Sequence, residues 1–78
     1  MKQVILYTKP NCPLCEDAKQ LLMIIQQHAS FELQEVDIYQ DDALLEKYQL
    51  MIPVVHMGGK DIDYGQIDLD KIWHVIAD

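Results

Sequence analysis

The spacing of apolar residues divides the first half of the chain into a strand, a long helix and a second strand. An apolar run that ends before Lys9-Pro10 predicts a buried strand over residues 2–7. From Pro13 to about His28, apolar residues recur at helical spacing with polar residues on the opposite side, which predicts an amphipathic helix. Residues 31–38 alternate as in a strand, but the phase slips at Gln34-Glu35, so we expect an irregularity there.

The second half of the chain reads as a helix, a hairpin and a final helix. Asp41-Asp42 can cap a helix that ends near Gln49 and carries Leu44, Leu45 and Tyr48. Residues 54–57 and 60–64 predict two strands, and the glycines at 58 and 59 supply the positive φ angles of a tight turn between them. Asp68 opens a last helix, whose apolar residues are Leu69, Ile72, Trp73 and Ile76.

The predicted order of elements is β-α-β-α-β-β-α, within a single domain that spans residues 1–78. A helix between the first two strands is a natural right-handed crossover, so these strands should be parallel, whereas the hairpin must be antiparallel. We therefore expect an α/β fold with a mixed four-stranded sheet and helices packed on both faces.

Charge and hydropathy exclude several classes of partner. Six basic residues stand against thirteen acidic ones, and a net charge of −7 repels nucleic acid and anionic membrane surfaces. No stretch approaches the roughly 20 apolar residues needed to span a bilayer, and the apolar run near the N-terminus is too short for a secretory signal. We expect a cytoplasmic protein, in a compartment that keeps thiols reduced.

The only two cysteines, Cys12 and Cys15, allow three interpretations: a structural staple, a metal clamp or a redox centre. As a staple, the pair would close a loop of only four residues, worth roughly 2 kcal/mol, and would join nothing distant. A metal site within one chain lacks further ligands, because the three histidines are scattered singly. The redox interpretation is the one with a specific geometry behind it.

In that geometry, Cys12 stands at the entrance of the helix and Cys15 in its first turn, with α-carbons ~5 Å apart, close enough for a disulfide. Pro13 suits the first helical position, which leaves Cys12 beside the unpaired amides of the helix start, where a thiolate is stabilised. Lys9 is either a further cationic partner of the sulfur or a solvated loop residue, and the acidic Glu16 acts against ionisation.

The segment "YTKPNCPLC" at residues 7–15 closely resembles the active-site segment of glutaredoxins. "MIPVV" at 51–55 and "GGK" at 58–60 resemble the later proline motif and hairpin of that family, and "EVDIYQDDALLEKYQLMIPVV" is similar to small bacterial glutaredoxin-like proteins. The resemblance implies a thioredoxin/glutaredoxin fold with a cis Ile52–Pro53 bond against the cysteines. The backbone of Ile52 would pair with a substrate beside Cys12. Lys9 matches the basic residue of the family. Tyr7 is interpreted first as a packing residue, and its place near the site would also let it border the substrate groove.

One departure concerns glutathione. Glutathione-binding glutaredoxins carry Gly-Gly or Gly-Cys followed by Asp at the start of the last helix, where this chain has "DYGQIDLD". Because this motif of the glutathione-binding members is only partly matched, a thioredoxin-reductase-like protein is a candidate reductant beside glutathione. The sequence has no nicotinamide or flavin motif, so no tightly bound cofactor is expected.

We predict a monomeric thiol–disulfide oxidoreductase that acts in electron transport and cell redox homeostasis. Cys12 would attack the disulfide of a protein or a small molecule, and Cys15 would resolve the mixed disulfide. Substrate contacts are expected from Lys9, Tyr7, Pro13, Ile52 and Pro53. Two alternatives stay open: an iron–sulfur or other metal-binding module in which Cys12 of two chains supplies ligands, and a redox-silent adaptor.

Overall fold

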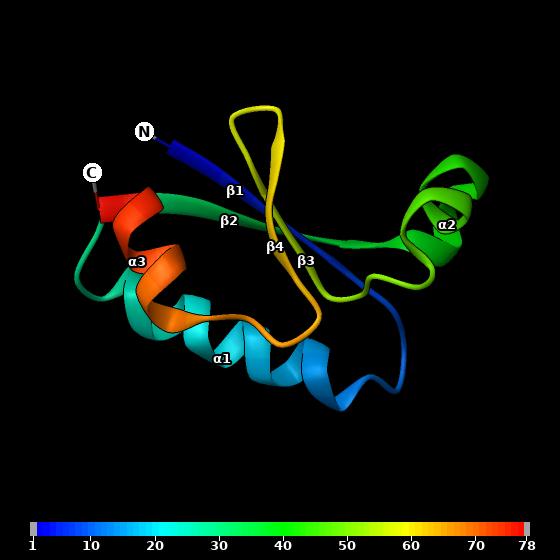
Figure 1. The fold of residues 1–78 in the computed structure, drawn as a ribbon, viewed down its shortest axis with the longest axis horizontal. Helices are drawn as coiled ribbons and strands as arrows, with labels where there is room; N and C mark the ends of the chain where they lie inside the picture. Colours follow the sequence, from blue (N-terminus) through cyan, green and yellow to red (C-terminus); the bar gives the residue numbers. More distant parts are fainter. Residues whose placement is uncertain (1, 78) are drawn as a thin grey trace.

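A computed structural model describes residues 2–77 and confirms the predicted order of elements (Figure 1). The strands are β1 (Lys2–Thr8), β2 (Phe31–Asp37), β3 (Val54–Met57) and β4 (Lys60–Tyr64). The helices are α1 (Pro13–Gln26), α2 (Asp42–Tyr48) and α3 (Leu69–Ala77), and a short 3₁₀ turn, η1 (Ile38–Gln40), precedes α2. The first helix ends slightly earlier than its apolar periodicity suggested.

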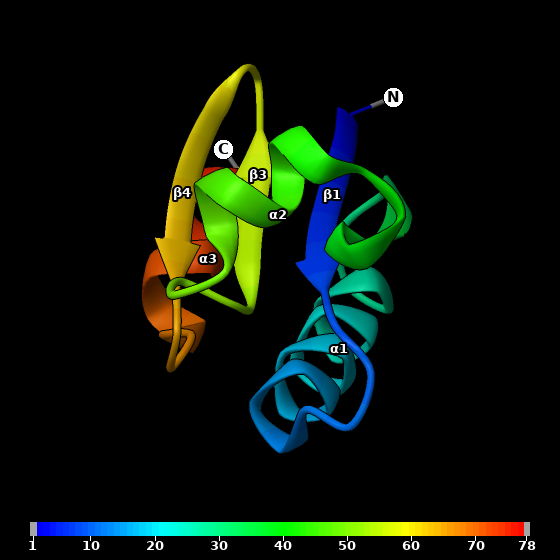
Figure 2. The same ribbon diagram turned by 90° about the vertical axis from the view of Figure 1, so that its right-hand side faces the viewer.

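The four strands form one mixed sheet in the order β2-β1-β3-β4. β1 and β2 are parallel and are joined by α1, whereas β3 runs antiparallel to both β1 and β4. Gly58 and Gly59, at φ +62° and +79°, make the turn of the hairpin as predicted. Figure 2 shows β4, β3 and β1 side by side, with α2 crossing in front of them.

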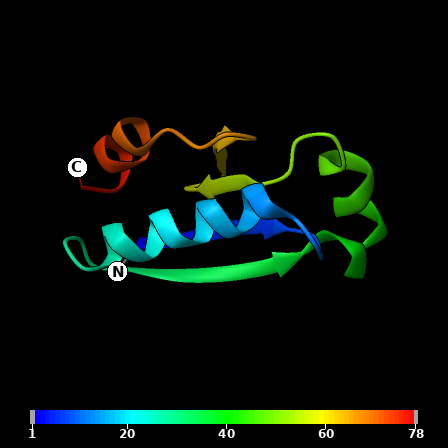
Figure 3. The ribbon, with the colours of Figure 1, turned by 90° about the horizontal axis from the view of Figure 1, so that it is seen from below.

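Each face of the sheet buries its own apolar cluster, so the predicted helices on both faces are confirmed. Val4 and Leu6 face α1 and α3, which lie together on one side of the sheet (Figure 3). Because side chains alternate along a strand, Tyr7 points to the opposite face. There it packs with Ile38, Tyr48 and Val54 under α2.

The irregularity expected at Gln34-Glu35 is absent. β1 and β2 pair one residue at a time from Lys2 opposite Phe31 to Thr8 opposite Asp37, and the register shift in the sheet falls between β3 and β4 instead. The apolar phase changes because the covering helix changes: Phe31 belongs to the α1 cluster, whereas Ile38, already in η1, belongs to the α2 cluster.

The last helix begins as predicted but buries less than its sequence suggested. The carboxylate of Asp68 accepts hydrogen bonds from the amides of Asp70 and Lys71 and so caps α3. Ile72 and Ile76 are buried, whereas Trp73 remains 36% exposed. Among residues 2–77, no helix is both long enough and apolar enough to cross a membrane.

Candidate active site

A sharp turn leads the chain from the end of β1 into α1. Asn11 lies at the turn with φ +57°, a left-handed conformation that Asn tolerates better than most residues. The turn is followed by Cys12 in an extended conformation and by Pro13 at the first helical position. Proline suits this position because its missing N–H would have no partner in the helix. The local sequence therefore fixes where the helix begins.

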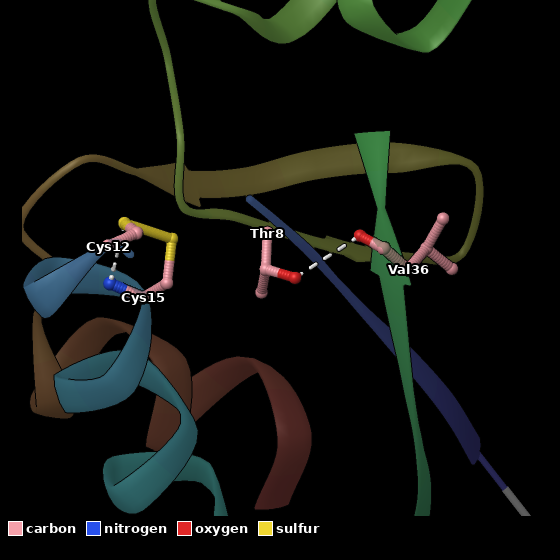
Figure 4. Close-up of a disulfide and its surroundings, with 4 residues drawn as sticks. All are labelled: Thr8, Cys12, Cys15 and Val36. Carbon is pink, nitrogen blue, oxygen red and sulfur yellow. Dashed lines mark hydrogen bonds between the residues drawn. A yellow bond between two sulfur atoms is a disulfide. The ribbon is translucent and has the colours of Figure 1, made fainter. Parts of the chain in front are cut away.

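Cys12 is the N-cap of α1, as the sequence predicted. Its sulfur accepts a hydrogen bond from the amide of Cys15 at 3.1 Å, so the sulfur takes the place that a Ser or Asp oxygen commonly fills (Figure 4). The two residues form a disulfide with their α-carbons 5.2 Å apart, in agreement with the predicted separation. The pair can therefore exist as a disulfide without any rearrangement of the helix.

The two cysteines differ in exposure. Cys12 is partly exposed, whereas Cys15 is only 4% exposed. Cys12 thus faces solvent while Cys15 lies behind it. At the end of β1, before the turn to Cys12, Thr8 is buried and donates from its hydroxyl to the carbonyl oxygen of Val36 on β2 (Figure 4).

A hollow of about 540 Å³ lies beside Cys12 and is bordered by Lys9, Pro13 and Glu16 among others. Lys9 and Pro13 therefore line the same hollow as Cys12. Lys9 and Glu16 have opposite charges, so the surroundings of Cys12 are electrostatically mixed. The predicted contacts of Lys9 and Pro13 with a substrate stay predictions.

The Ile52–Pro53 peptide bond is cis, as the family resemblance implied. Val54 pairs with Tyr7, so the preceding Pro53 lies beside the end of β1 from which the chain departs toward Cys12. The amide of Gly65 donates to the carbonyl oxygens of Pro53 and Met51, at 2.8 and 3.1 Å. The segment between β4 and α3 therefore holds the proline segment in place.

Tyr7 lies on the α2 face of the sheet and stacks on Tyr48, with ring centroids 4.7 Å apart. The sequence reasoning missed the polar group next to this pair. Asp61 accepts a hydrogen bond from the hydroxyl of Tyr48 at 2.9 Å, and Nδ1 of His56 lies 2.8 Å from the same carboxylate oxygen. A role for Tyr7 in substrate binding stays a prediction.

The same hydrogen bonds, together with burial, shift the pKa values of Asp61 and Tyr48. Burial by itself would raise the pKa of the Asp61 carboxyl, but the hydrogen bonds from His56 and Tyr48 outweigh it and lower the pKa below its ordinary value. Burial, assisted by the hydrogen bond to Asp61, raises the pKa of the Tyr48 phenol. The ionised carboxylate and the neutral phenol are the forms that the fold stabilises.

The three histidines occupy separate places. His28 packs edge-on against Trp73 at the far end of α1, His56 pairs with Asp61, and His74 lies on α3. Within residues 2–77, no three side chains of the His, Cys, Asp and Glu types come together as a metal site would require.

The profile of the Glutaredoxin-like domain (DUF836) family matches residues 3–77. The chain belongs to this family. The glutaredoxin-like chain is also similar to solved structures. A protein from Nitrosomonas europaea is 25% identical to this chain and superposes on it with a TM-score of 0.86. The superposition covers 96% of this chain and 91% of the Nitrosomonas protein. A protein from X. campestris, 24% identical, has a TM-score of 0.79 with 95% of each chain covered.

More distant neighbours confirm the fold class. A wheat glutaredoxin, 21% identical, gives a TM-score of 0.55 over 92% of this chain and 68% of its own. A mutant thioredoxin from Halobacterium salinarum, 16% identical, gives a TM-score of 0.68, with 96% of this chain and 71% of the thioredoxin covered. The chain thus combines a thioredoxin/glutaredoxin-like fold with a Cys-x-x-Cys pair at disulfide distance, an arrangement consistent with thiol redox chemistry.

Proposed function

We propose that this chain is a thiol–disulfide oxidoreductase that reduces disulfides of proteins or small molecules. The observation that carries the proposal is the asymmetric pair at the start of α1. Cys12 is partly exposed and caps the helix, and Cys15 lies buried behind it at disulfide distance. A sulfur at a helix N-terminus faces amide groups that stabilise its thiolate, which is the nucleophile in disulfide exchange.

The reaction has two exchange steps. In the first, the Cys12 thiolate attacks one sulfur of the substrate disulfide, forms a mixed disulfide and releases the other substrate sulfur as a thiolate. In the second, the Cys15 thiolate attacks the sulfur of Cys12 and releases the remaining substrate thiolate. The substrate gains two electrons, and the chain is left with its Cys12–Cys15 disulfide.

The position of Cys15 next to Cys12 suits the second step. A mixed disulfide on Cys12 keeps its sulfur next to Cys15, so resolution is intramolecular and proceeds at a high effective concentration. A reductant must then return two electrons to the pair, either as two molecules of a monothiol such as glutathione or as one dithiol. Glutathione and a thioredoxin-reductase-like protein are the two proposed sources.

The backbone of Ile52 and the ring of Pro53 are the proposed boundary of the substrate site on the sheet side. The pairing of Tyr7 with Val54 and the hydrogen bond from Gly65 to Pro53 hold this segment at the end of β1. An extended substrate segment would hydrogen-bond to the backbone there while its disulfide meets Cys12.

Turnover of a protein disulfide by the Cys12→Ser variant tests the proposal. With insulin as substrate and dithiothreitol as reductant, we expect the variant to show only the uncatalysed rate, because Ser lacks a thiolate. Circular dichroism controls for folding, since Ser can replace the sulfur as a helix cap. Turnover equal to that of the unmodified chain would refute the function and leave the adaptor alternative.

A further inference from the structure

Two surface hollows lie along α1, one nearer the cysteines and one further from them. The nearer hollow lies between α1 and the segment that leads into α3, and the further one lies between α1 and α3 itself. The first, of about 160 Å³, is lined by Leu14, Leu21 and Ile67, and the second, of about 210 Å³, by Ile24, Leu69 and Trp73. We call these six residues the α1 seam. In Figures 1 and 3 the segment before α3 and α3 itself follow the side of α1.

Four of the six seam side chains are large, apolar and exposed to solvent. Leu14, Ile24, Leu69 and Trp73 are 45%, 53%, 46% and 36% exposed. Scattered exposed apolar residues need no explanation, but Leu14 borders the first hollow and the other three border the second. A partly exposed tryptophan in a groove is a common anchor of protein interfaces. The seam therefore has the character of a binding surface.

The charges along the seam are acidic. Asp17 lines the first hollow and Asp70 the second, and within residues 2–77 neither carboxylate forms an ion pair. Lys19 and Lys71, which share their helices, are already paired with Glu35 and Asp63 at 3.4 and 3.8 Å. A partner with apolar and basic side chains is the one that complements this surface.

The seam begins at the redox pair. Leu14 stands between Cys12 and Cys15, and helical rise places Ile24 about 15 Å further along α1. An extended peptide covers that distance with about five residues. A single substrate segment can thus lie in the seam while a neighbouring cysteine reaches Cys12.

We propose that the α1 seam docks a segment of the protein substrate in which apolar and basic residues adjoin the disulfide. The proposal rests on the oxidoreductase function and adds a substrate class: basic, partly apolar polypeptides. Docking along the seam lowers KM for such substrates and leaves the exchange at Cys12 unchanged for a small disulfide that cannot reach Ile24.

Paired variants on α1 provide the test. Ile24→Gln removes an apolar side chain from the seam, and Met23→Gln is the matched control. Met23 is similarly exposed, at 45%, and lies outside both hollows. Gln is a good helix former, so neither change disturbs α1. Thermal melting of both variants checks that the fold is retained.

The probes are mixed disulfides that release coloured thionitrobenzoate. One carries the peptide Lys-Leu-Lys-Leu-Leu-Cys, a second has Glu in place of each Lys, and the third is cysteine amide alone. Ile24→Gln should raise KM for the lysine peptide about 5- to 10-fold with kcat unchanged, through the loss of buried apolar area. Met23→Gln should change nothing, and no variant should affect cysteine amide. The unmodified chain should prefer the lysine peptide over the glutamate peptide.

Each other outcome has a distinct meaning. If the unmodified chain reduces none of the probes, the oxidoreductase function itself fails. If it reduces all of them and the two variants behave alike, or if the glutamate peptide is as good a substrate as the lysine peptide, only the docking proposal is overturned. Sedimentation that shows a dimer abolished by Ile24→Gln would also overturn it, because a second copy would then fill the seam.

Discussion

The backbone amide of Gly65 donates to the carbonyl oxygen of Pro53 at 2.8 Å and thereby ties the segment after β4 to the proline segment next to the end of β1. Gly65 makes this contact at φ +71°, a conformation that costs other residues about 1–2 kcal/mol. A Cβ at this position would meet no neighbouring atom within 4 Å. The conformation of Gly65, rather than its small size, is therefore what the contact requires.

Gly65→Ala should lower the free energy of unfolding by about 1 kcal/mol. Relief of this backbone strain turns the amide away from Pro53, so the rate of insulin reduction should fall a few-fold as well. Gly58→Ala is the matched control, because Gly58 has φ +62° and open surroundings but lies in the hairpin turn. Equal loss of activity in both variants would show that stability, and not the tie to Pro53, sets the rate.

Cys15→Ser should trap the substrate on Cys12. Without the buried thiol at disulfide distance, the mixed disulfide has no intramolecular route of resolution. Intact-protein mass spectrometry after incubation with the lysine peptide probe should show the peptide bound to the chain. Cys12→Ser under the same conditions should carry no peptide, and a peptide on both variants would reverse the assigned roles.

Lys9→Gln should slow the reaction of the reduced chain with a doubly anionic disulfide, such as bis(thionitrobenzoate) disulfide. Lys9 borders the same hollow as Cys12 and offers the positive charge there, so its loss should reduce the rate about 2- to 5-fold. The effect should shrink at ~1 M salt, where charges are screened within about 3 Å. Lys60→Gln, in the exposed hairpin, should leave the rate unchanged.

Asp61→Asn should destabilise the chain at neutral pH by about 1–2 kcal/mol, since the carboxylate accepts two hydrogen bonds. Because the fold lowers the pKa of Asp61, its contribution is complete above the ordinary value of 3.8 and disappears as the pH falls through the lower folded value. Urea unfolding at about pH 7 and about pH 3 should show the difference between variant and parent shrinking with acid. A difference that persists in acid would exclude the charge as its cause, and Glu46→Gln serves as the control for an exposed carboxylate on α2.

Much of the fold was predictable because its signals are local. Helical periodicity, the caps at Asp41 and Asp68, and the Gly58-Gly59 turn all act over a few residues, and the structure confirms them. The start of α1 was predictable for the same reason: Cys12, Pro13 and Cys15 determine their own geometry within one helical turn.

The features that the sequence did not predict depend on contacts between distant segments. The phase change in β2 was interpreted as an irregularity, although it records a change of covering helix that only the tertiary arrangement reveals. Asp61 joins Tyr48 from thirteen residues away, and Trp73 faces the surface because Ile72 and Ile76 already fill the core. No short-range pattern encodes the α1 seam, which forms only where α1 meets α3 and the segment before it.

The sulfur of Cys12 accepts the hydrogen bond from the amide of Cys15 and is also the proposed reacting atom. The chemical shift of the Cys15 amide proton should consequently report whether the cysteine pair is oxidised or reduced. A negatively charged sulfur draws the proton more strongly than a disulfide sulfur does. Its nuclear resonance should therefore move downfield on reduction, while amides deep in the sheet keep their frequencies.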